Sequence, residues 1–277
     1  MDVIAVTRLE RDFVGVRGPD AESYLQAMVS NDVEALSPGD SCDALLLTAK
    51  ARVIAPLVVW RRSADDFLLL TAPGLGERVR ATLVRSRFAA KCEIAIEEHA
   101  SALVVGVEAP AGTVANRDYG LPAYEIVDGE PPADARIADP EELERLRIRA
   151  RTPVWGREVD ERILPAEAGL ELRAIDFAKG CYPGQEPVAR QHYRGRVNRT
   201  LRVLEIDGDE LPEYDAEILW DGKVAGRVTS AVQDGERVLA LAYVRREVPS
   251  DAGLEVAGWP ARQRDETPLD LATPARP

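Results

Sequence analysis

The chain has 277 residues, a formal net charge of −13 at pH 7, 45% hydrophobic residues and 30% charged residues. This length allows a large core and two or three packed units, and the negative charge argues against broad nucleic-acid binding. Residues 1–10 lack a signal-peptide pattern and no apolar run is long enough to span a bilayer, so we expect a cytoplasmic protein without membrane contact.

The three cysteines are widely spaced and form no Cys-x-x-Cys pair. Cys42 and Cys92 fit the pattern of small buried apolar residues. The chain has only two histidines, His99 and His192. The sequence therefore predicts neither a disulfide scaffold nor a metal or iron–sulfur site built from this chain alone.

In the first half of the chain, alternating apolar residues predict strands and helical spacing predicts two helices. Strands are expected at residues 3–16, 45–47, 53–60, 67–71, 92–97 and 102–107. The helices are expected at residues 21–29, with Asp20 as the N-cap, and at residues 76–86.

In the second half, residues 128–139 read as a loop, and Asp139 is the expected cap of a helix over 140–150. Residues 172–178 are strand-like and a short helix is expected at 187–191. The last part has turn signals between four short predicted strands, at 201–206, 217–220, 223–230 and 238–244. This pattern predicts a small C-terminal β-barrel, followed by a disordered tail at 261–277.

The segment Lys179-Gly180-Cys181-Tyr182-Pro183-Gly184-Gln185-Glu186 is rich in chemically active groups. Residues 173–202 carry seven Lys and Arg against two Asp and Glu, a net charge of +5 within an acidic chain. Cationic neighbours favour the reactive thiolate of a cysteine. The pattern therefore predicts a reactive thiol at Cys181, with Lys179 beside it and an anion site nearby.

Each of these residues also has a simpler interpretation. Cys181 could be a buried turn cysteine, and Lys179 and Arg190 could be solvated surface charges. Gln185 and Glu186 could satisfy N–H groups at the start of a helix. The sequence leaves these alternatives open.

The same segment resembles the K-G-C-[YF]-x-G-Q-E signature of the YgfZ-type proteins, in the folate-binding aminomethyltransferase (glycine-cleavage T-protein) superfamily. Four other stretches are similar to patterns of that superfamily, and the resemblance spans residues 6–244. They are Gly18-Pro19-Asp20-Ala21 with Ser30-Asn31-Asp32-Val33, Arg117-Asp118-Tyr119-Gly120, Tyr124-Glu125-Ile126 and residues 164–170.

The resemblance implies an α+β fold of three domains arranged as a ring. Residues 1–200 would form two intertwined subdomains, the second at roughly 45–115, and residues 201–260 the β-barrel. It further implies a tetrahydrofolate-type ligand near the ring centre and a role in assembly or repair of iron–sulfur proteins, including enzymes that modify tRNA. The implied partners are those client proteins or cluster assembly factors, without direct nucleic-acid binding.

The resemblance also assigns candidate residues. Cys181 and Lys179 are the candidate catalytic pair. The candidate cofactor-binding residues are Asn31, Asp32, Arg117, Tyr119, Arg149, Gln185, Glu186 and Arg190.

Two departures from the superfamily bear on its transferase chemistry. Residues 71–76 carry no Asn or Asp where aminomethyltransferases have an N-A-x-N…D segment, and Arg149 stands where folate binders have a glutamate. A carboxylate can accept from adjacent ring N–H and amino groups of a pterin, whereas Arg149 can only donate. Glu171 or Glu125 could substitute. We expect a protein that is not a conventional aminomethyltransferase, the alternatives being a folate-dependent one-carbon transferase or demethylase, or a purely structural interaction module.

Overall fold

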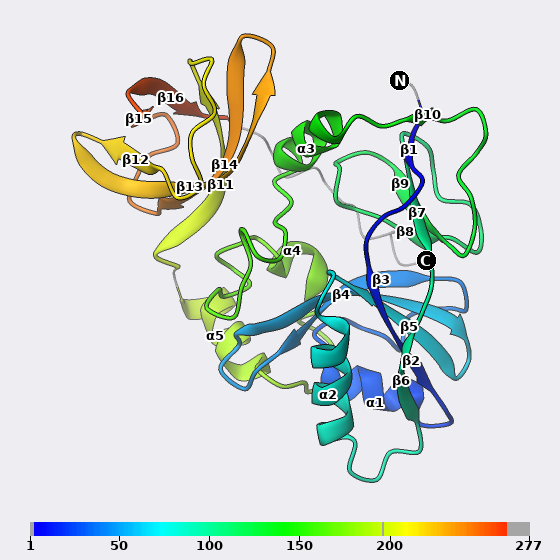
Figure 1. The fold of residues 1–277 in the computed structure, drawn as a ribbon. Helices are drawn as coiled ribbons and strands as arrows, with labels where there is room; N and C mark the ends of the chain where they lie inside the picture. The colour runs from blue at the N-terminus through cyan, green and yellow to red at the C-terminus, as the bar shows by residue number, and fades with distance from the viewer. Residues whose placement is uncertain (1–2, 196, 265–277) are drawn as a thin grey trace.

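The computed structural model describes residues 3–195 and 197–264, which form two five-stranded sheets, a closed β-barrel and five helices. In Figure 1 the barrel lies on one side of the molecule and the two sheets on the other, with helices α3, α4 and α5 between them. Separate sheets, a barrel and few helices confirm the predicted α+β class.

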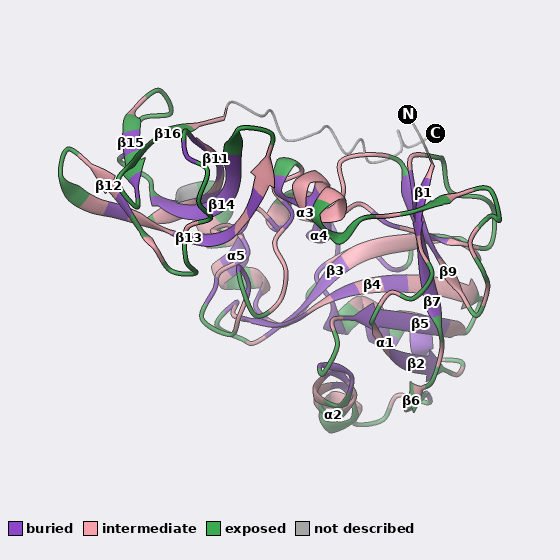
Figure 2. Cartoon of the chain, turned by 45° about the horizontal axis from the view of Figure 1, so that its top comes forward, coloured by how far each residue is buried: buried purple, intermediate pink, exposed green. Residues whose placement is uncertain are grey.

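The first sheet is antiparallel, with the strand order β3-β4-β5-β2-β6. Its strands are β2 (Asp12–Arg17), β3 (Ser41–Leu47), β4 (Val53–Ser63), β5 (Asp66–Thr71) and β6 (Glu93–Glu97). Helices α1 (Ala21–Met28) and α2 (Gly76–Ser86) cover one face, where Phe67 and Leu69 of β5 are buried in their core cluster. Because side chains alternate along a strand, Leu68 and Leu70 are buried in a second cluster. Figure 2 shows buried residues along β2 and β5.

The second sheet has the strand order β10-β1-β7-β9-β8. Its strands are β1 (Ile4–Val6), β7 (Ser101–Val105), β8 (Val114–Ala115), β9 (Ala123–Val127) and β10 (Arg136–Ile137). Only the β1–β10 pair within this sheet is parallel. The two sheets are interlaced along the chain, because β1 belongs to one and β2 to the other.

Six strands close the barrel in the order β11-β14-β13-β12-β15-β16. They are β11 (Arg199–Ile206), β12 (Glu217–Trp220), β13 (Lys223–Asp234), β14 (Arg237–Arg245), β15 (Gly253–Val256) and β16 (Trp259–Gln263). Closure leaves no unpaired sheet edge around the barrel wall. The far end of β13 extends beyond this closed region, since β12 pairs only with its residues 223–227.

Helices α3 (Pro140–Arg149), α4 (Glu171–Ala174) and α5 (Gln185–Arg194) connect the sheets to the barrel. One core cluster contains Leu45 and Leu47 of β3, Tyr182 and Val188 around the start of α5, and residues of β11 and β14. The cysteine motif is therefore built into the apolar junction between the first sheet and the barrel.

Some local predictions were right and others wrong. The cap of α3 is confirmed, because the Asp139 side chain accepts from the Glu141 N–H at 2.9 Å. Asp20 makes no such cap for α1 and accepts from Lys91 N instead. Residues 3–16 form two strands in different sheets rather than one.

Two predictions near the C-terminal half also need correction. The strand-like stretch 172–178 begins within helix α4 and continues as a loop. Residues 261–263, predicted to be disordered, lie in β16, where they pair with β11 and β15. Arg264 of the predicted tail donates its backbone N–H to the Val203 carbonyl at 3.0 Å, and residues 265–277 lie outside the described residues.

Candidate functional site

The cysteine motif forms the loop that leads into α5. Cys181 is exposed, whereas Tyr182 beside it is buried in the core that joins sheet and barrel. Gly184 precedes the first residue of α5 with a φ of 86°. A Cβ there would lie 2.6 Å from the Thr48 carbonyl oxygen, so the motif packs against the β3–β4 turn at a place that only glycine fits.

Lys179 is buried and points into the protein. Its Nζ donates to the carbonyl oxygens of Gln26, Val29 and Asn31 at 2.8, 2.7 and 2.6 Å. An ammonium group has three hydrogens, so all of them are used at the end of α1. Burial lowers the pKa of Lys179 to about 8. The geometry gives Lys179 a structural role, different from the predicted one beside the thiol.

The other motif residues lie at the surface around the first turns of α5. Glu186 and Arg190 are exposed, and neither side chain has a hydrogen bond or ion pair among the described residues. Gln185 donates its backbone N–H to the Tyr182 carbonyl at 3.2 Å. His192 is exposed and stacks on the Phe177 ring at a centroid distance of 4.0 Å.

Much of the basic charge around the motif is used in internal contacts. Arg199 pairs with Glu167 at 3.2 Å, and Arg202 donates to the Gln263 side chain at 2.5 Å. Lys179 and Arg173 are also bonded within the protein. Four of the seven cations counted in the sequence are therefore held by internal contacts.

Asn31 and Asp32 hold the backbone of the segment between α1 and β3. The Asn31 amide donates to the carbonyl oxygens of Asp43 and Arg173 at 2.7 and 3.2 Å, and its oxygen accepts from the Asp32 N–H. The Asp32 carboxylate accepts from Gln26 Nε2 at 3.0 Å. Both side chains thus form hydrogen bonds within the protein. The two bonds donated by Asn31 hold β3 next to the residues that precede the motif.

A group of charged side chains meets where β3, the loop after β8 and α4 come together. We call it the central charge cluster; its members are Arg11, Asp43, Arg117, Asp118 and Arg173. Arg173 donates to Asp118 Oδ1 at 2.7 Å and to the Arg117 carbonyl at 2.9 Å. Burial favours the neutral form of Asp118, but Arg173 and Arg11 outweigh it and lower the pKa of Asp118.

Two atoms of this cluster are buried without a hydrogen-bond partner among the described residues. They are Asp43 Oδ2 and Arg117 Nη1, which are 3.7 Å apart; Arg173 Nε lies 3.9 Å from the same Asp43 oxygen. Burial raises the pKa of Asp43, although Arg173 and Arg117 oppose it. Burial also raises the pKa of the neighbouring Cys42 thiol to about 12, so this thiol stays protonated. A buried carboxylate oxygen and a buried guanidinium N–H that lack hydrogen bonds can together accept from and donate to a polar ligand.

Glu125 lies beside the cluster and is fully engaged. Its carboxylate accepts from Arg11 Nη2 at 2.6 Å, from Asn116 Nδ2 at 2.8 Å and from Ser101 Oγ at 3.1 Å. Tyr119 is half-buried, and burial raises its pKa. Glu125 therefore holds Arg11 and the loop after β8 in place and has little remaining capacity for a ligand.

Arg149 is away from this cluster. It is exposed at the end of α3, and its Nη2 contacts both carboxylate oxygens of Asp234 in β13 at 2.7 Å. The guanidinium that α3 buries is that of Arg147, which pairs with Glu144 at 2.6 Å and lies 3.4 Å from Glu158. Arg149, which stands where folate binders have a glutamate, thus joins α3 to the barrel in this chain.

The sequence prediction named Arg117 as a site residue but missed the other four members of the cluster, Arg11, Asp43, Asp118 and Arg173. A signal for Asp43 was present, because a carboxylate interrupts the apolar strand β3 between Cys42 and Ala44. Glu171, named as a substitute carboxylate, is half-buried, and burial raises its pKa while His192 opposes the shift.

Two classes of site find no support in the described residues. Among residues 3–195 and 197–264, no group of three or more His, Cys, Asp and Glu side chains could hold a metal ion. Within the same ranges, no helix is long and apolar enough to cross a membrane.

Comparison with known proteins identifies relatives along nearly the whole chain, although no family model matches. The tRNA-modifying protein YgfZ of Edwardsiella ictaluri is 27% identical over 94% of this chain and 90% of its own length. YgfZ of Serratia proteamaculans is 28% identical over 94% of this chain and 87% of its own length.

A solved structure supports the same relationship at the level of the fold. Glycine cleavage system aminomethyltransferase T from Bartonella henselae superimposes with a TM-score of 0.82, covering 97% of this chain and 86% of that protein, at 16% identity. This likeness establishes the aminomethyltransferase fold that the motifs predicted. The chain is thus similar to YgfZ proteins over nearly its whole length and has the aminomethyltransferase fold.

Proposed function

We propose that this chain binds a tetrahydrofolate-type ligand at the central charge cluster and acts as an accessory protein in the assembly or repair of iron–sulfur proteins. The observation that carries the ligand proposal is that two buried atoms, Asp43 Oδ2 and Arg117 Nη1, have no hydrogen-bond partner among the described residues. Burying such groups without partners costs free energy. A ligand that pairs with both would recover that cost.

The chemistry of these two groups suits a pterin. A carboxylate oxygen can accept from a ring N–H or amino group, and a guanidinium N–H can donate to a ring carbonyl. Arg173 would hold Arg117 in place through its bond to the Arg117 carbonyl. Arg173 is in turn fixed by Asp118, whose Oδ2 lies 3.8 Å from Arg11 Nη2. Tetrahydrofolate carries one-carbon units on its ring nitrogens, and that is the chemistry it would bring to the site.

The accessory role is favoured over aminomethyl transfer by the residues available. Asp32 and Glu125 are engaged in internal hydrogen bonds, and residues 71–76 carry no Asn or Asp. Of the carboxylates named from the sequence as possible pocket groups, Glu171 remains. A one-carbon transferase would need free carboxylates for its chemistry, and few are left here. Binding a ligand does not require them.

Cys181 is the second part of the proposal. The thiol is exposed on a loop that Gly184, Tyr182 and Lys179 fix to the rest of the protein. A rigidly presented exposed thiol can react with or transiently bind a group on a partner. We propose cytoplasmic iron–sulfur client proteins or cluster assembly factors as those partners. The relatives' description as tRNA-modifying favours clients that act on tRNA.

Calorimetric titration with tetrahydrofolate tests the ligand proposal. Asp43→Asn keeps the shape of the side chain and replaces one acceptor oxygen with a donor, so affinity should fall by about 10- to 100-fold. Arg149→Gln is the matched control and should bind as the wild type does. Unchanged binding by Asp43→Asn, or loss of binding by Arg149→Gln alone, would refute the assignment.

The thiol proposal needs a test in cells. Cys181→Ser is expected to fold normally and to fail to restore the activity of client iron–sulfur enzymes in cells that lack this protein. Full client activity with Cys181→Ser would exclude a role for the thiol and leave the ligand proposal standing.

A further inference from the structure

Asn31 joins the two segments that bring Asp43 and Arg173 into the central charge cluster. Its Nδ2 donates to the Asp43 carbonyl of β3 at 2.7 Å and to the Arg173 carbonyl of α4 at 3.2 Å. The side chains of the same two residues face each other, with Arg173 Nε 3.9 Å from Asp43 Oδ2. One amide therefore links the backbones of two residues whose charged ends meet in the cluster.

The amide of Asn31 has only one orientation that satisfies its neighbours. Both hydrogens of Nδ2 are used by the two carbonyls, and the amide oxygen accepts from the Asp32 N–H at 2.9 Å. A flipped amide would point its oxygen at two carbonyl oxygens, neither of which can donate. Because no amide hydrogen remains for a ligand, Asn31 can act on the cluster only through Asp43 and Arg173.

Neighbouring contacts fix the backbone that carries Asn31. Lys179 Nζ donates to the Asn31 carbonyl at 2.6 Å, which is a charge-assisted hydrogen bond. One residue earlier, Ser30 Oγ accepts from Leu45 N of β3 at 2.8 Å and donates to the Ala174 carbonyl of α4 at 2.6 Å. Two successive side chains thus bridge the same two segments, so β3 and α4 can neither slide nor separate without breaking hydrogen bonds.

The spacing held by this bridge matters because Asp43 lies just outside contact with two arginines. Its Oδ2 is 3.7 Å from Arg117 Nη1 and 3.9 Å from Arg173 Nε, and it makes no hydrogen bond among the described residues. Hydrogen bonds between nitrogen and oxygen are about 2.7–3.2 Å long. A shift of β3 by roughly 0.5–1 Å would therefore let the carboxylate pair with an arginine, and the free acceptor oxygen would be lost.

We propose that Asn31 is the positioning residue of the central charge cluster. By fixing β3 against α4, it keeps the Asp43 carboxylate just beyond hydrogen-bond distance of Arg117 and Arg173, so that an acceptor oxygen stays free for a ligand. Such preorganisation raises affinity because the site needs no rearrangement on binding. This role rests on the proposed ligand site and adds the residue that holds the site open. Lys179 takes part through the Asn31 carbonyl, so the cysteine motif also supports the ligand site.

Two measurements on Asn31→Ala test the proposal. In calorimetric titration with tetrahydrofolate, affinity should fall by about tenfold or more relative to the wild type, because Asp43 would pair with an arginine instead. In an NMR titration of the side-chain carboxyl, Asp43 should titrate at a lower pH than in the wild type, because a guanidinium partner lowers the pKa of a carboxylate. Asn31→Ser can donate to one carbonyl at most, and it allows the same comparison with the wild type if Asn31→Ala does not fold.

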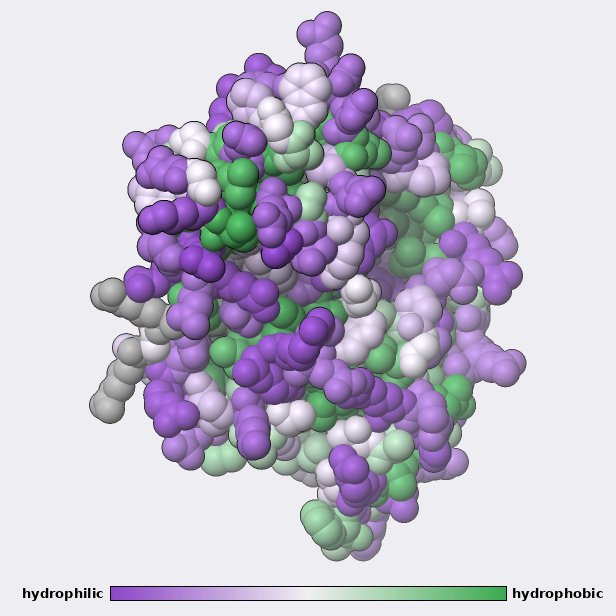
Figure 3. Space-filling view, turned by 60° about the vertical axis from the view of Figure 1, so that its left-hand side comes forward, coloured by the Kyte–Doolittle hydropathy of each residue, from purple (hydrophilic) through white to green (hydrophobic). Residues whose placement is uncertain are grey.

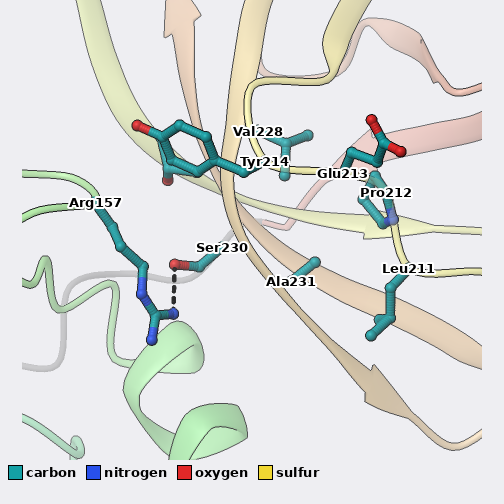
Figure 4. Close-up of a pocket in the computed structure, with 9 residues that line it drawn as sticks. Arg157, Leu211, Pro212, Glu213, Tyr214, Val228, Ser230 and Ala231 are labelled. Atoms are coloured by element: carbon teal, nitrogen blue, oxygen red, sulfur yellow. Dashed lines mark hydrogen bonds between the residues drawn. The ribbon is translucent and has the colours of Figure 1, made fainter.

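Ser230→Ala is the matched control for lost stability. Ser230 belongs to the barrel, which lies on the side of the molecule that Figure 3 brings forward, where hydrophobic side chains form separate areas among hydrophilic ones. The buried Ser230 hydroxyl donates to Glu158 at 2.6 Å and accepts from Arg157 at 3.3 Å, the second bond being drawn in Figure 4. Its loss removes buried hydrogen bonds outside the cluster, so tetrahydrofolate affinity and the titration of Asp43 should match the wild type.

A failure of the proposed ligand site can be told apart from a failure of the positioning role. If the wild type does not bind tetrahydrofolate, the proposed function fails, and a lower pKa of Asp43 in Asn31→Ala would still support the positioning role. The positioning role is overturned if Asp43 titrates in the Asn31 variants as in the wild type, or if these variants bind tetrahydrofolate as the wild type does. It is also overturned if Ser230→Ala changes both readouts as much as Asn31→Ala.

Discussion

Replacing Lys179 by Met separates a structural role for this lysine from a role in thiol chemistry. The substitution keeps an apolar stem and removes the ammonium that caps the end of α1. Three hydrogen bonds from a charged donor are lost, each contributing about 1.5–3 kcal/mol. Burial lowers the pKa of Lys179 and so offsets part of this gain; the free energy of unfolding should fall by about 2–5 kcal/mol.

Urea unfolding followed by circular dichroism and tryptophan fluorescence measures this loss. Lys223→Met is the matched control, because Lys223 is exposed on β13, and it should change stability by no more than about 0.5 kcal/mol. In Lys179→Met, the rate at which iodoacetamide alkylates Cys181 in the native protein should stay at the wild-type value. A loss of stability below about 1 kcal/mol, together with slower alkylation, would refute the structural role.

Other substitutions test separate parts of the structure. Gly184→Ala should lose more stability than Gly222→Ala, by about 1–3 kcal/mol in urea unfolding, because both positions have positive φ but only a Cβ at 184 meets the backbone of the β3–β4 turn. Equal losses would contradict that contact. Cys181→Ser should unfold within about 0.5 kcal/mol of the wild type, and a larger loss would show that the thiol is part of the core. Burial acts to lower the pKa of His99, but its contacts with Glu97 and Asp128 outweigh this and raise the pKa above 6.5. His99→Gln should therefore cost more stability at about pH 5.5 than at about pH 9, because the contribution of the charged histidine is complete below its unfolded pKa and is lost as pH rises through its folded pKa. A difference that does not vary with pH would contradict this coupling.

The cysteine motif could be located from the sequence, but the role of its lysine could not. Lys179 is two residues from Cys181, which suggested a local charge effect. Its partners at Gln26, Val29 and Asn31 are 148–153 positions away along the chain. Such contacts depend on how α1 packs against the motif loop, and local sequence spacing carries no information about that packing.

The fold could be recognised because the cysteine motif and several shorter stretches resemble patterns of the superfamily, and the structural comparison confirms the fold. The charge cluster could be predicted only in part. Arg117 was named, whereas the partners of Asp43 were not evident from the sequence: the structure brings Arg117 and Arg173 to within 4 Å of its carboxylate. Arg149 was expected at the ligand because of its place in a motif, but its neighbour on the barrel, Asp234, is 85 positions away.

A crystal structure of the chain with tetrahydrofolate would test the central claim most directly. The account predicts that the pterin ring lies at the central charge cluster, with a ring N–H or amino group donating to Asp43 Oδ2 and Arg117 Nη1 donating to the ligand. A pterin bound at Arg149, or anywhere else with Asp43 and Arg117 still unpaired, would contradict it.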